Sequence, residues 1–116
     1  MTLPQDLQLV HDFARHLGAR LGARLERISL FGSRARRDHA FRSDYDLLLV
    51  VSKPTGAVRS TIHHEATLWE LAHNVDLSTK IVSDADFARL LPTAEPFWKN
   101  FRRDELQLWP TNSTPG

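Results

Sequence analysis

The sequence predicts an α/β domain in which helices pack against a small mixed β-sheet. Segments with helical periodicity alternate with short apolar segments along the 116 residues, as expected when helices cover a sheet. The clearest apolar segment, residues 43–51, ends in five successive apolar residues, "LLLVV". Such runs are typical of strands that are buried on both faces. A chain of this length is expected to form a single domain.

The N-terminal half predicts a helix, a strand, a short helix and a second strand. Apolar residues follow at helical spacing after Thr2 or Pro4, and we expect this helix to end near Gly22. Residues 24–31, "RLERISLF", are typical of a short strand, and "GSRAR" is expected to turn into a short helix. Residues 43–51 form the second predicted strand.

The C-terminal half predicts one further helix–strand pair and two short helices. Helical periodicity covers residues 57–73, and residues 74–83 are typical of a third strand. Two helices are expected over residues 84–91 and 94–106, divided by Pro92. We expect residues 1–108 to form the single domain and residues 109–116 a frayed tail.

The composition excludes several classes of function. The chain contains no cysteine, which excludes disulfides, thiolate catalysis and cysteine-based zinc sites, although six histidines remain possible metal ligands. The net charge of +1 provides no overall field that would recruit nucleic acid or an anionic membrane. We find no apolar run long enough to span a bilayer and no signal-peptide pattern at the start. A cytoplasmic location is therefore expected.

Three aspartates stand at the beginnings of predicted strands. Asp44 and Asp46 are two residues apart, so they are expected to point to one face of their strand, roughly 6–7 Å apart. Two carboxylates this close raise each other's pKa unless they share a cation, and Mg²⁺ prefers one or two carboxylates together with phosphate oxygens. Asp76 begins the next strand and is expected to converge with them around two metal ions. The alternatives are that the pair is merely solvated and that Asp76 is a turn residue.

The loop before the second strand has features of a phosphate site. Gly32 allows close approach of the backbone, and Ser33 adds a hydroxyl and free N–H groups at the start of a helical turn. Arg34, Arg36 and Arg37 add positive charge. By itself a Gly-Ser turn followed by arginines is weak evidence and usually indicates a solvated loop, and this one matches neither a Walker loop nor Gly-x-Gly-x-x-Gly.

Several residues outside these motifs also have a structural or a functional interpretation. Lys80 lies on the same strand face as Asp76, where it is expected either to meet a phosphate or to pair with an acid. Trp98 and Phe101 are expected in the core or at a partner interface. The charged residues 102–105 are expected to form a solvated helix face.

The combination of these motifs resembles a known enzyme family. Gly32-Ser33, then ten residues, Asp44-Tyr45-Asp46-Leu47 and a later Asp76 resemble the nucleotidyltransferase superfamily of the polymerase-beta type. "GSRAR…SDYDLLLV" is similar to the minimal nucleotidyltransferase (MNT) group within it, and "EPFWKNFRRDELQLW" resembles the closing helix of such proteins.

The resemblance implies a polymerase-beta-like fold and Mg²⁺-dependent transfer of a nucleoside monophosphate from an NTP to a hydroxyl group, with AMP from ATP as the first hypothesis. It implies that Asp44, Asp46 and Asp76 are catalytic and bind two metal ions, and that Gly32, Ser33 and Arg36 bind the nucleotide. The family usually has Gly where this chain has Arg37, which puts the loop geometry in question if that position needs a positive φ.

The resemblance also implies a partner. Similar proteins commonly act as antitoxins that AMPylate a HEPN-type toxin, so a protein acceptor is expected. We expect no membrane and no direct nucleic-acid binding, and a homo-oligomer or a hetero-oligomer is possible. The alternatives are a non-catalytic module that neutralises a partner by contact, and an adenylyltransferase for a small molecule of the aminoglycoside type.

Overall fold

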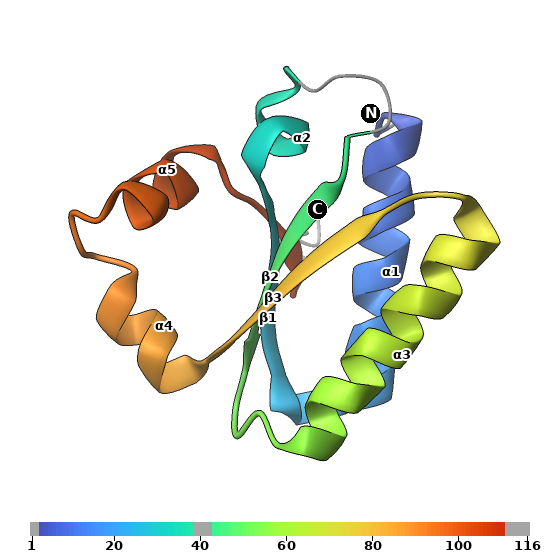
Figure 1. The fold of residues 1–116 in the computed structure, drawn as a ribbon, viewed down its shortest axis with the longest axis horizontal. Coiled ribbons are helices and arrows are strands. Elements are labelled where there is room, and N and C mark those ends of the chain that lie inside the picture. The colour runs from blue at the N-terminus through green and yellow to red at the C-terminus, as the bar shows by residue number, and fades with distance from the viewer. Residues whose placement is uncertain (1–2, 39–42, 111–116) are drawn as a thin grey trace, which may run out of the picture.

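A computed structural model describes residues 3–38 and 43–110 (Figure 1). Five helices, one 3₁₀ turn and four strands follow one another along this part of the chain. They are α1 (Gln5–Leu21), η1 (Gly22–Arg24), β1 (Leu25–Phe31), α2 (Gly32–Arg36), β2 (Tyr45–Val51), α3 (Gly56–His73), β3 (Leu77–Ser83), α4 (Asp84–Leu90), α5 (Pro96–Asp104) and β4 (Leu106–Trp109).

The four strands form one mixed sheet in the order β3-β2-β1-β4. β1 pairs antiparallel with β2 and with β4, whereas β2 and β3 are parallel. The parallel pair is connected through α3, because parallel strands need a crossover that spans the sheet. The α/β fold with a small mixed sheet is thus confirmed.

Helices cover both faces of this sheet, and each face has its own core. α1 and α3 lie on one side, and α4 and α5 on the other (Figure 1). Side chains alternate along β2: Leu47 and Leu49 pack with α1 and α3, whereas Leu48 and Val50 pack with Trp98 and Phe101 of α5. Asp46 belongs to the second set by the same alternation, and it therefore begins the face that α5 covers.

Most predicted elements are confirmed within a few residues of their expected ends. The first helix ends at Leu21 and is followed by Gly22 at φ 61°, a conformation that favours glycine. Thr55 begins α3, because its hydroxyl accepts a hydrogen bond from the Val58 N–H at 3.2 Å. Ser83 begins α4 in the same way, with the Asp86 N–H at 3.0 Å.

The prediction of a helix over residues 94–106 is wrong at its C-terminal end. The helix stops at Asp104, and Leu106–Trp109 form an edge strand that pairs with β1. Hence "LQLW" is not part of a closing helix, and Trp109 does not belong to a frayed tail. Residues 111–116 lie outside the described residues.

Long-range contacts explain why the chain leaves the helix here. Glu105 has extended backbone angles and pairs with Arg27, and its other carboxylate oxygen accepts a hydrogen bond of 2.7 Å from the buried Ser29 hydroxyl. A Cβ at Gly18 of α1 would lie 2.5 Å from the Trp109 indole, so this glycine provides the space in which the indole packs. Both contacts fasten β4 to the fold, and Glu105 is not part of a solvated helix face.

No helix among the described residues is long and apolar enough to cross a membrane.

The assignment of β4 predicts unequal effects of two leucine substitutions. Leu108 is 1% exposed and Leu106 is 39% exposed. Leu108→Ala is expected to lower the free energy of unfolding by about 2–5 kcal/mol, because it opens a cavity in the core. Leu106→Ala is the matched control and is expected to cost less than about 1 kcal/mol. Equal effects in urea titrations would contradict the strand assignment.

Candidate active site

The candidate site lies at the edge of the sheet where β1 ends and where β2 and β3 begin (Figure 1). Phe31, the last residue of β1, is paired with Asp46. Tyr45 is paired with Leu77, and the Tyr45 N–H donates a hydrogen bond of 2.9 Å to the Asp76 carbonyl. The antiparallel and parallel pairings therefore bring the backbones of Gly32, Asp46 and Asp76 to one edge.

The Asp46 carboxylate lies against the backbone of Gly32. A Cβ placed on Gly32 would be 2.5 Å from the Asp46 Oδ2 atom, and Gly32 has a φ of 73°. The backbone conformation therefore favours glycine here, and any other residue would also displace the Asp46 carboxylate from its observed position. The sequence predicted that a ligand approaches the backbone at this glycine, which stays a prediction; the structure shows that the missing side chain makes room for the Asp46 carboxylate.

The carboxylate of Asp46 is electrostatically unfavourable as it stands. Burial raises its pKa above the ordinary value of 3.8, and the neighbouring Asp44 raises it further, while Arg36 acts in the opposite direction. Within the part of the chain that the structure describes, neither aspartate has an ion pair or a hydrogen bond to its side chain. The pair therefore carries negative charge that the described chain does not neutralise.

Two nearby arginines are held by other groups. The guanidinium of Arg34 donates two hydrogen bonds, of 3.1 and 2.9 Å, to the Ser43 carbonyl, and it lies 4.1 Å from the Tyr45 ring centroid. It thereby holds the residues on both sides of Asp44. Arg37 donates hydrogen bonds of 2.6 and 3.0 Å to the Asp6 carboxylate on α1.

Arg37 occupies the left-handed region of backbone conformation. Its φ of 66° and ψ of 21° end α2. A residue other than glycine pays roughly 1–2 kcal/mol for this conformation, and the paired Asp6 carboxylate offsets part of that cost. The turn therefore has the positive φ that the usual glycine would favour, although the side chain differs.

Arg36, the third arginine of the loop, lies at a small pocket beside the carboxylates. It pairs with Asp38 at 3.0 Å and with Asp104 of α5 at 3.3 Å. Arg103 and Arg36 together lower the pKa of Asp104 to about 2. The side chain of Asp104 is only 8% exposed, so the expectation that it belongs to a solvated helix face is wrong.

The third predicted acid does not complete a metal cluster. Asp76 is exposed at the start of β3, one residue before the partner of Tyr45. Within residues 3–38 and 43–110, no three His, Asp or Glu side chains are arranged so that they could hold a metal ion. The predicted convergence of all three carboxylates is therefore not present in the side-chain arrangement observed.

The two remaining acids nevertheless suit a divalent cation. Asp44 and Asp46 offer hard carboxylate oxygens, and burial leaves the Asp46 charge without a partner in the described chain. Mg²⁺ is usually bound by one or two carboxylates while substrate phosphates and water complete the shell. The donor set thus fits one Mg²⁺ ion that arrives with a phosphate ligand.

Two residues that could face a phosphate lie beside the acids. Ser33 is half-buried in α2, and its hydroxyl has no hydrogen bond among the described residues. Lys80 of β3 pairs with no acid in the described chain, and its ammonium group lies 4.2 Å from the Phe97 ring centroid. The ammonium is therefore available for an anionic ligand on the face of the sheet that α5 covers.

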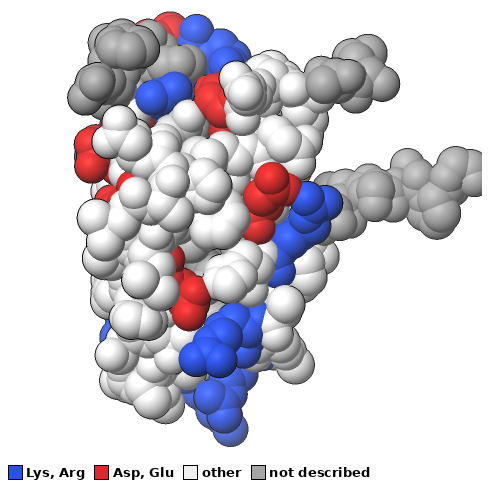
Figure 2. Space-filling view, turned by 90° about the vertical axis from the view of Figure 1, so that its right-hand side faces the viewer, with Lys and Arg blue, Asp and Glu red and all other residues white. Residues whose placement is uncertain are grey.

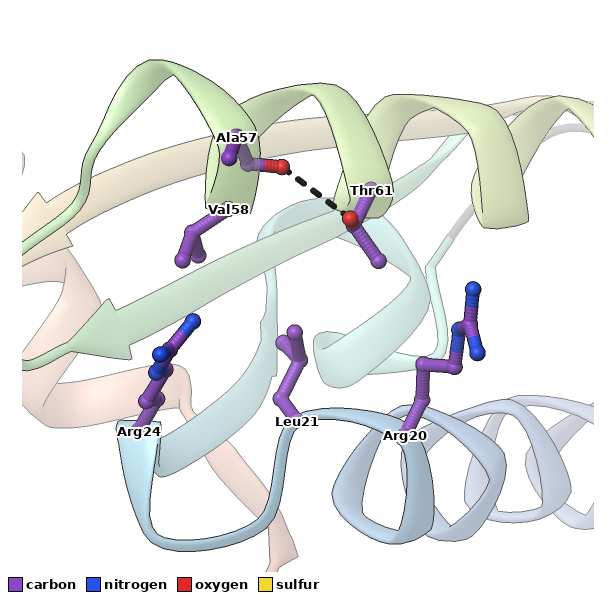
Figure 3. A pocket seen from close by; sticks show the side chains of 6 residues that line it. All are labelled: Arg20, Leu21, Arg24, Ala57, Val58 and Thr61. Atoms are coloured by element: carbon purple, nitrogen blue, oxygen red, sulfur yellow. Dashed lines mark hydrogen bonds between the residues drawn. The ribbon is translucent and has the colours of Figure 1, made fainter.

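A larger pocket of about 400 Å³ lies where α1 ends and α3 begins, between Arg20, Arg24 and Thr61 (Figure 3). This is the lower end of the face shown in Figure 2, where Lys and Arg side chains gather. The Thr61 hydroxyl is already bound to the Ala57 carbonyl at 3.0 Å. Among the described residues no acid lines this pocket, and the two aspartates lie at the other end of the sheet.

Comparison with known proteins agrees with this geometry. The sequence profile of the family described as "Nucleotidyltransferase domain" matches residues 13–108. A protein of Methanocaldococcus jannaschii named "Putative protein adenylyltransferase" is 30% identical over 73 residues, which are 62% of this chain and 74% of the relative.

The fold is similar to that of solved toxin–antitoxin proteins. A chain of a toxin–antitoxin complex with AMP-PNP superposes with a TM-score of 0.57 at 20% identity, over 88% of this chain and 74% of the other. A chain from the complex of tri-AMPylated Shewanella oneidensis HEPN toxin with MNT antitoxin gives a TM-score of 0.53 at 20% identity, over 90% and 73%.

The raised pKa of Asp46 predicts a pH-dependent effect of its removal. Above the folded-state pKa the ionised side chain opposes folding, whereas below 3.8 it is neutral in both the folded and unfolded chain. Asp46→Asn is therefore expected to raise the free energy of unfolding at pH 7, and this gain should disappear as the pH falls below 3.8. Urea titrations at several pH values measure it.

Glu95→Gln is the control for this prediction, because Glu95 is exposed and has no ion pair within the described chain. It is expected to leave stability at pH 7 unchanged. A loss of stability in Asp46→Asn at pH 7 would show that the carboxylate is a structural group.

Proposed function

The chain belongs to the nucleotidyltransferase domain family, and we propose that it transfers AMP from ATP to a hydroxyl group of a partner protein. The observation that carries this proposal is the Asp44–Asp46 pair beside Gly32, a concentration of negative charge with which no described cation forms an ion pair. Negative charge without an ion-pair partner lowers the stability of the folded chain. Groups that are unfavourable for stability in this way are common at functional sites.

The reaction follows from the groups at this edge. The acceptor oxygen attacks the α-phosphorus of ATP, the bond from that phosphorus to the bridging oxygen of the β-phosphate breaks, and pyrophosphate leaves with the electron pair. When bound, Mg²⁺ supplies positive charge that stabilises the attacking and leaving oxygens. Asp44 and Asp46 are the residues that would hold it.

The remaining residues are assigned to binding and proton transfer. Gly32 and Ser33 are proposed to contact the triphosphate, with Lys80 as a further cation on the same face. Asp76 is proposed to take the proton of the acceptor hydroxyl, because it is exposed and lies beside Asp44 in the strand register. Arg34 is a positioning residue, since it holds both neighbours of Asp44 without reaching the substrate.

The proposed acceptor is a HEPN-type toxin. Two observations on other proteins support this choice: a similar fold occurs in the MNT antitoxin bound to a tri-AMPylated HEPN toxin, and the archaeal relative is named as a protein adenylyltransferase. We propose a tyrosine hydroxyl as the modified group. In this role the chain would be an antitoxin that inactivates its partner by AMPylation.

A non-catalytic binding module is the second candidate. The observation that favours it is that Asp44, Asp46 and Asp76 do not form a three-carboxylate cluster within the described chain. In that case the chain would neutralise a partner by contact alone.

Labelled ATP distinguishes the two candidates. The chain is incubated with α-labelled ATP, Mg²⁺ and a purified candidate HEPN protein, and label on the partner is measured. The double variant Asp44→Asn, Asp46→Asn is expected to lose transfer by about a thousandfold or more, since several kcal/mol of charge stabilisation are removed. Its fold should persist, as measured by circular dichroism.

Asp86→Asn is the control for the double variant, because Asp86 is an exposed acid of α4 paired with Arg89. It should retain the wild-type rate. A partner that binds but never becomes labelled would contradict transferase activity and support the binding module. Unfolding of the double variant would show that the acids were assigned the wrong role.

The hydrogen bonds of Arg34 predict that its substitution changes the Mg²⁺ dependence of the transfer reaction. Arg34→Met removes both hydrogen bonds to the Ser43 carbonyl and frees the backbone beside Asp44. Residues that orient metal ligands typically contribute about 10–100-fold to metal affinity or activity. We expect the Mg²⁺ concentration for half-maximal transfer to rise by about tenfold or more, and the rate to recover partly at high Mg²⁺.

Arg59→Met is the matched control, because Arg59 donates one hydrogen bond to the Pro54 carbonyl at the beginning of α3, far from the acids. Its Mg²⁺ dependence should equal that of the wild type. An unchanged Mg²⁺ dependence in Arg34→Met would remove Arg34 from the site.

A further inference from the structure

A small pocket opens directly beside the candidate active site. It has a volume of about 170 Å³, and Gly32 is part of its wall together with Phe31, Phe97 and Asn100. Sites for whole drug-sized ligands occupy roughly 300–1,000 Å³. This pocket therefore has room for one ring system of a ligand whose remaining part lies outside it, next to Gly32 and Asp46.

The apolar wall of the pocket is aromatic. Phe97 and Phe101 lie one helical turn apart on α5, with ring planes inclined by 15° and centroids 6.3 Å apart. Phe31 meets Phe97 edge-on at 5.5 Å. Phe31 and Phe97 are only partly buried, and the Lys80 ammonium lies over the Phe97 ring at 4.2 Å, so the ring surface accessible to a ligand is the part that Lys80 leaves uncovered. Flat aromatic surfaces of this kind favour stacking with a planar ring.

One neutral polar side chain stands among these rings. Asn100 of α5 is exposed and has no hydrogen bond within the described part of the chain. Its amide offers one acceptor and two donors. Arg36 and Asp104 also line the pocket and form an ion pair at 3.3 Å, so these two charges already have partners. Asn100 is thus the polar group of the pocket that is free to bind a ligand.

We propose that this pocket binds the adenine base of the nucleotide and that Asn100 determines the preference for adenine. This rests on the proposed function, because the base must belong to a nucleotide whose phosphates lie at Gly32 and Asp46. An asparagine amide pairs in a bidentate manner with an edge of adenine that carries one donor and one acceptor. The phenylalanine rings provide a surface on which any base can stack, so the stacking itself gives no preference for adenine.

The polar chemistry favours a base over the aromatic side chain of an acceptor tyrosine. A phenol ring has no polar edge that would use both the donor and the acceptor of Asn100, and its hydroxyl has to reach the α-phosphorus rather than the end of the pocket. Adenine uses both groups and leaves its ribose and phosphates directed toward Gly32.

The test changes the hydrogen-bonding groups of the Asn100 side chain and measures which base the chain prefers. Asn100→Asp replaces the amide donors by acceptors, which disfavours adenine and favours the N–H groups of guanine. Binding of ATP, GTP and inorganic triphosphate to the whole chain is measured by calorimetry with Mg²⁺ present. We expect ATP affinity to fall by about tenfold or more and the ATP-to-GTP preference to reverse, while triphosphate affinity changes little.

Lys99→Gln is the matched control, because it changes the net charge by the same amount on the neighbouring exposed residue of α5. It should leave the ATP-to-GTP preference unchanged. A second variant, Phe97→Leu, tests the stacking surface. It is expected to lower the affinity for ATP by about fivefold or more and to leave the affinity for triphosphate unchanged.

The outcomes separate this inference from the proposed function. If the wild type binds ATP and triphosphate but Asn100→Asp retains the wild-type base preference, the base lies elsewhere and the inference is overturned while the function stands. If Asn100→Asp instead raises only the KM for the protein acceptor, the pocket takes the acceptor side chain, which also overturns it. If the wild type binds neither ATP nor triphosphate, the proposed function and the inference both fail.

Discussion

The contact between the Asp46 carboxylate and the backbone of Gly32 is the feature on which the rest of the site depends. It follows from the antiparallel register that pairs Phe31 with Asp46, and the carboxylate occupies space that a Cβ at position 32 would take. Because this contact buries Asp46 beside Asp44, it also raises the pKa of Asp46. The same register therefore creates both the shape of the site and its need for a cation.

Arg34 and Arg37 hold the backbone around this contact in place, and neither forms an ion pair with Asp44 or Asp46 in the described chain. Arg34 holds the residues that flank Asp44, and Arg37 fastens the turn after α2 to the first helical turn of α1 through Asp6. Ion pairs of this kind at the surface contribute little stability individually. Their importance here is geometric, because they hold the turn after α2 and the residues beside Asp44 in place.

The sequence was sufficient for the parts of the fold that depend on local periodicity. The run of five apolar residues correctly predicted a strand buried on both faces, since Leu47 and Leu49 lie in one core and Leu48 and Val50 in the other. Strand registers, in contrast, are set by contacts between distant residues. The contact of Asp46 with Gly32 and the positive φ of Arg37 could therefore not be derived from residue patterns alone.

The helix predicted over residues 94–106 was wrong at its C-terminal end because contacts between distant residues determine the structure there as well. Helical periodicity runs smoothly through residues 96–104, and nothing local marks the following four residues as a strand. That strand is specified by Arg27 and Ser29 binding Glu105 and by the space over Gly18, contacts that span most of the chain. The pocket at Asn100 was missed for this reason too, since it exists only where α5 docks beside Gly32.

A crystal structure with Mn²⁺ and a non-hydrolysable ATP analogue tests the central claim most directly, because anomalous scattering locates the metal. The account predicts a metal ion within about 2–2.3 Å of carboxylate oxygens of both Asp44 and Asp46, with phosphates beside Gly32. Phosphates bound instead in the basic pocket between Arg20 and Arg24, with no metal at the two aspartates, would contradict it.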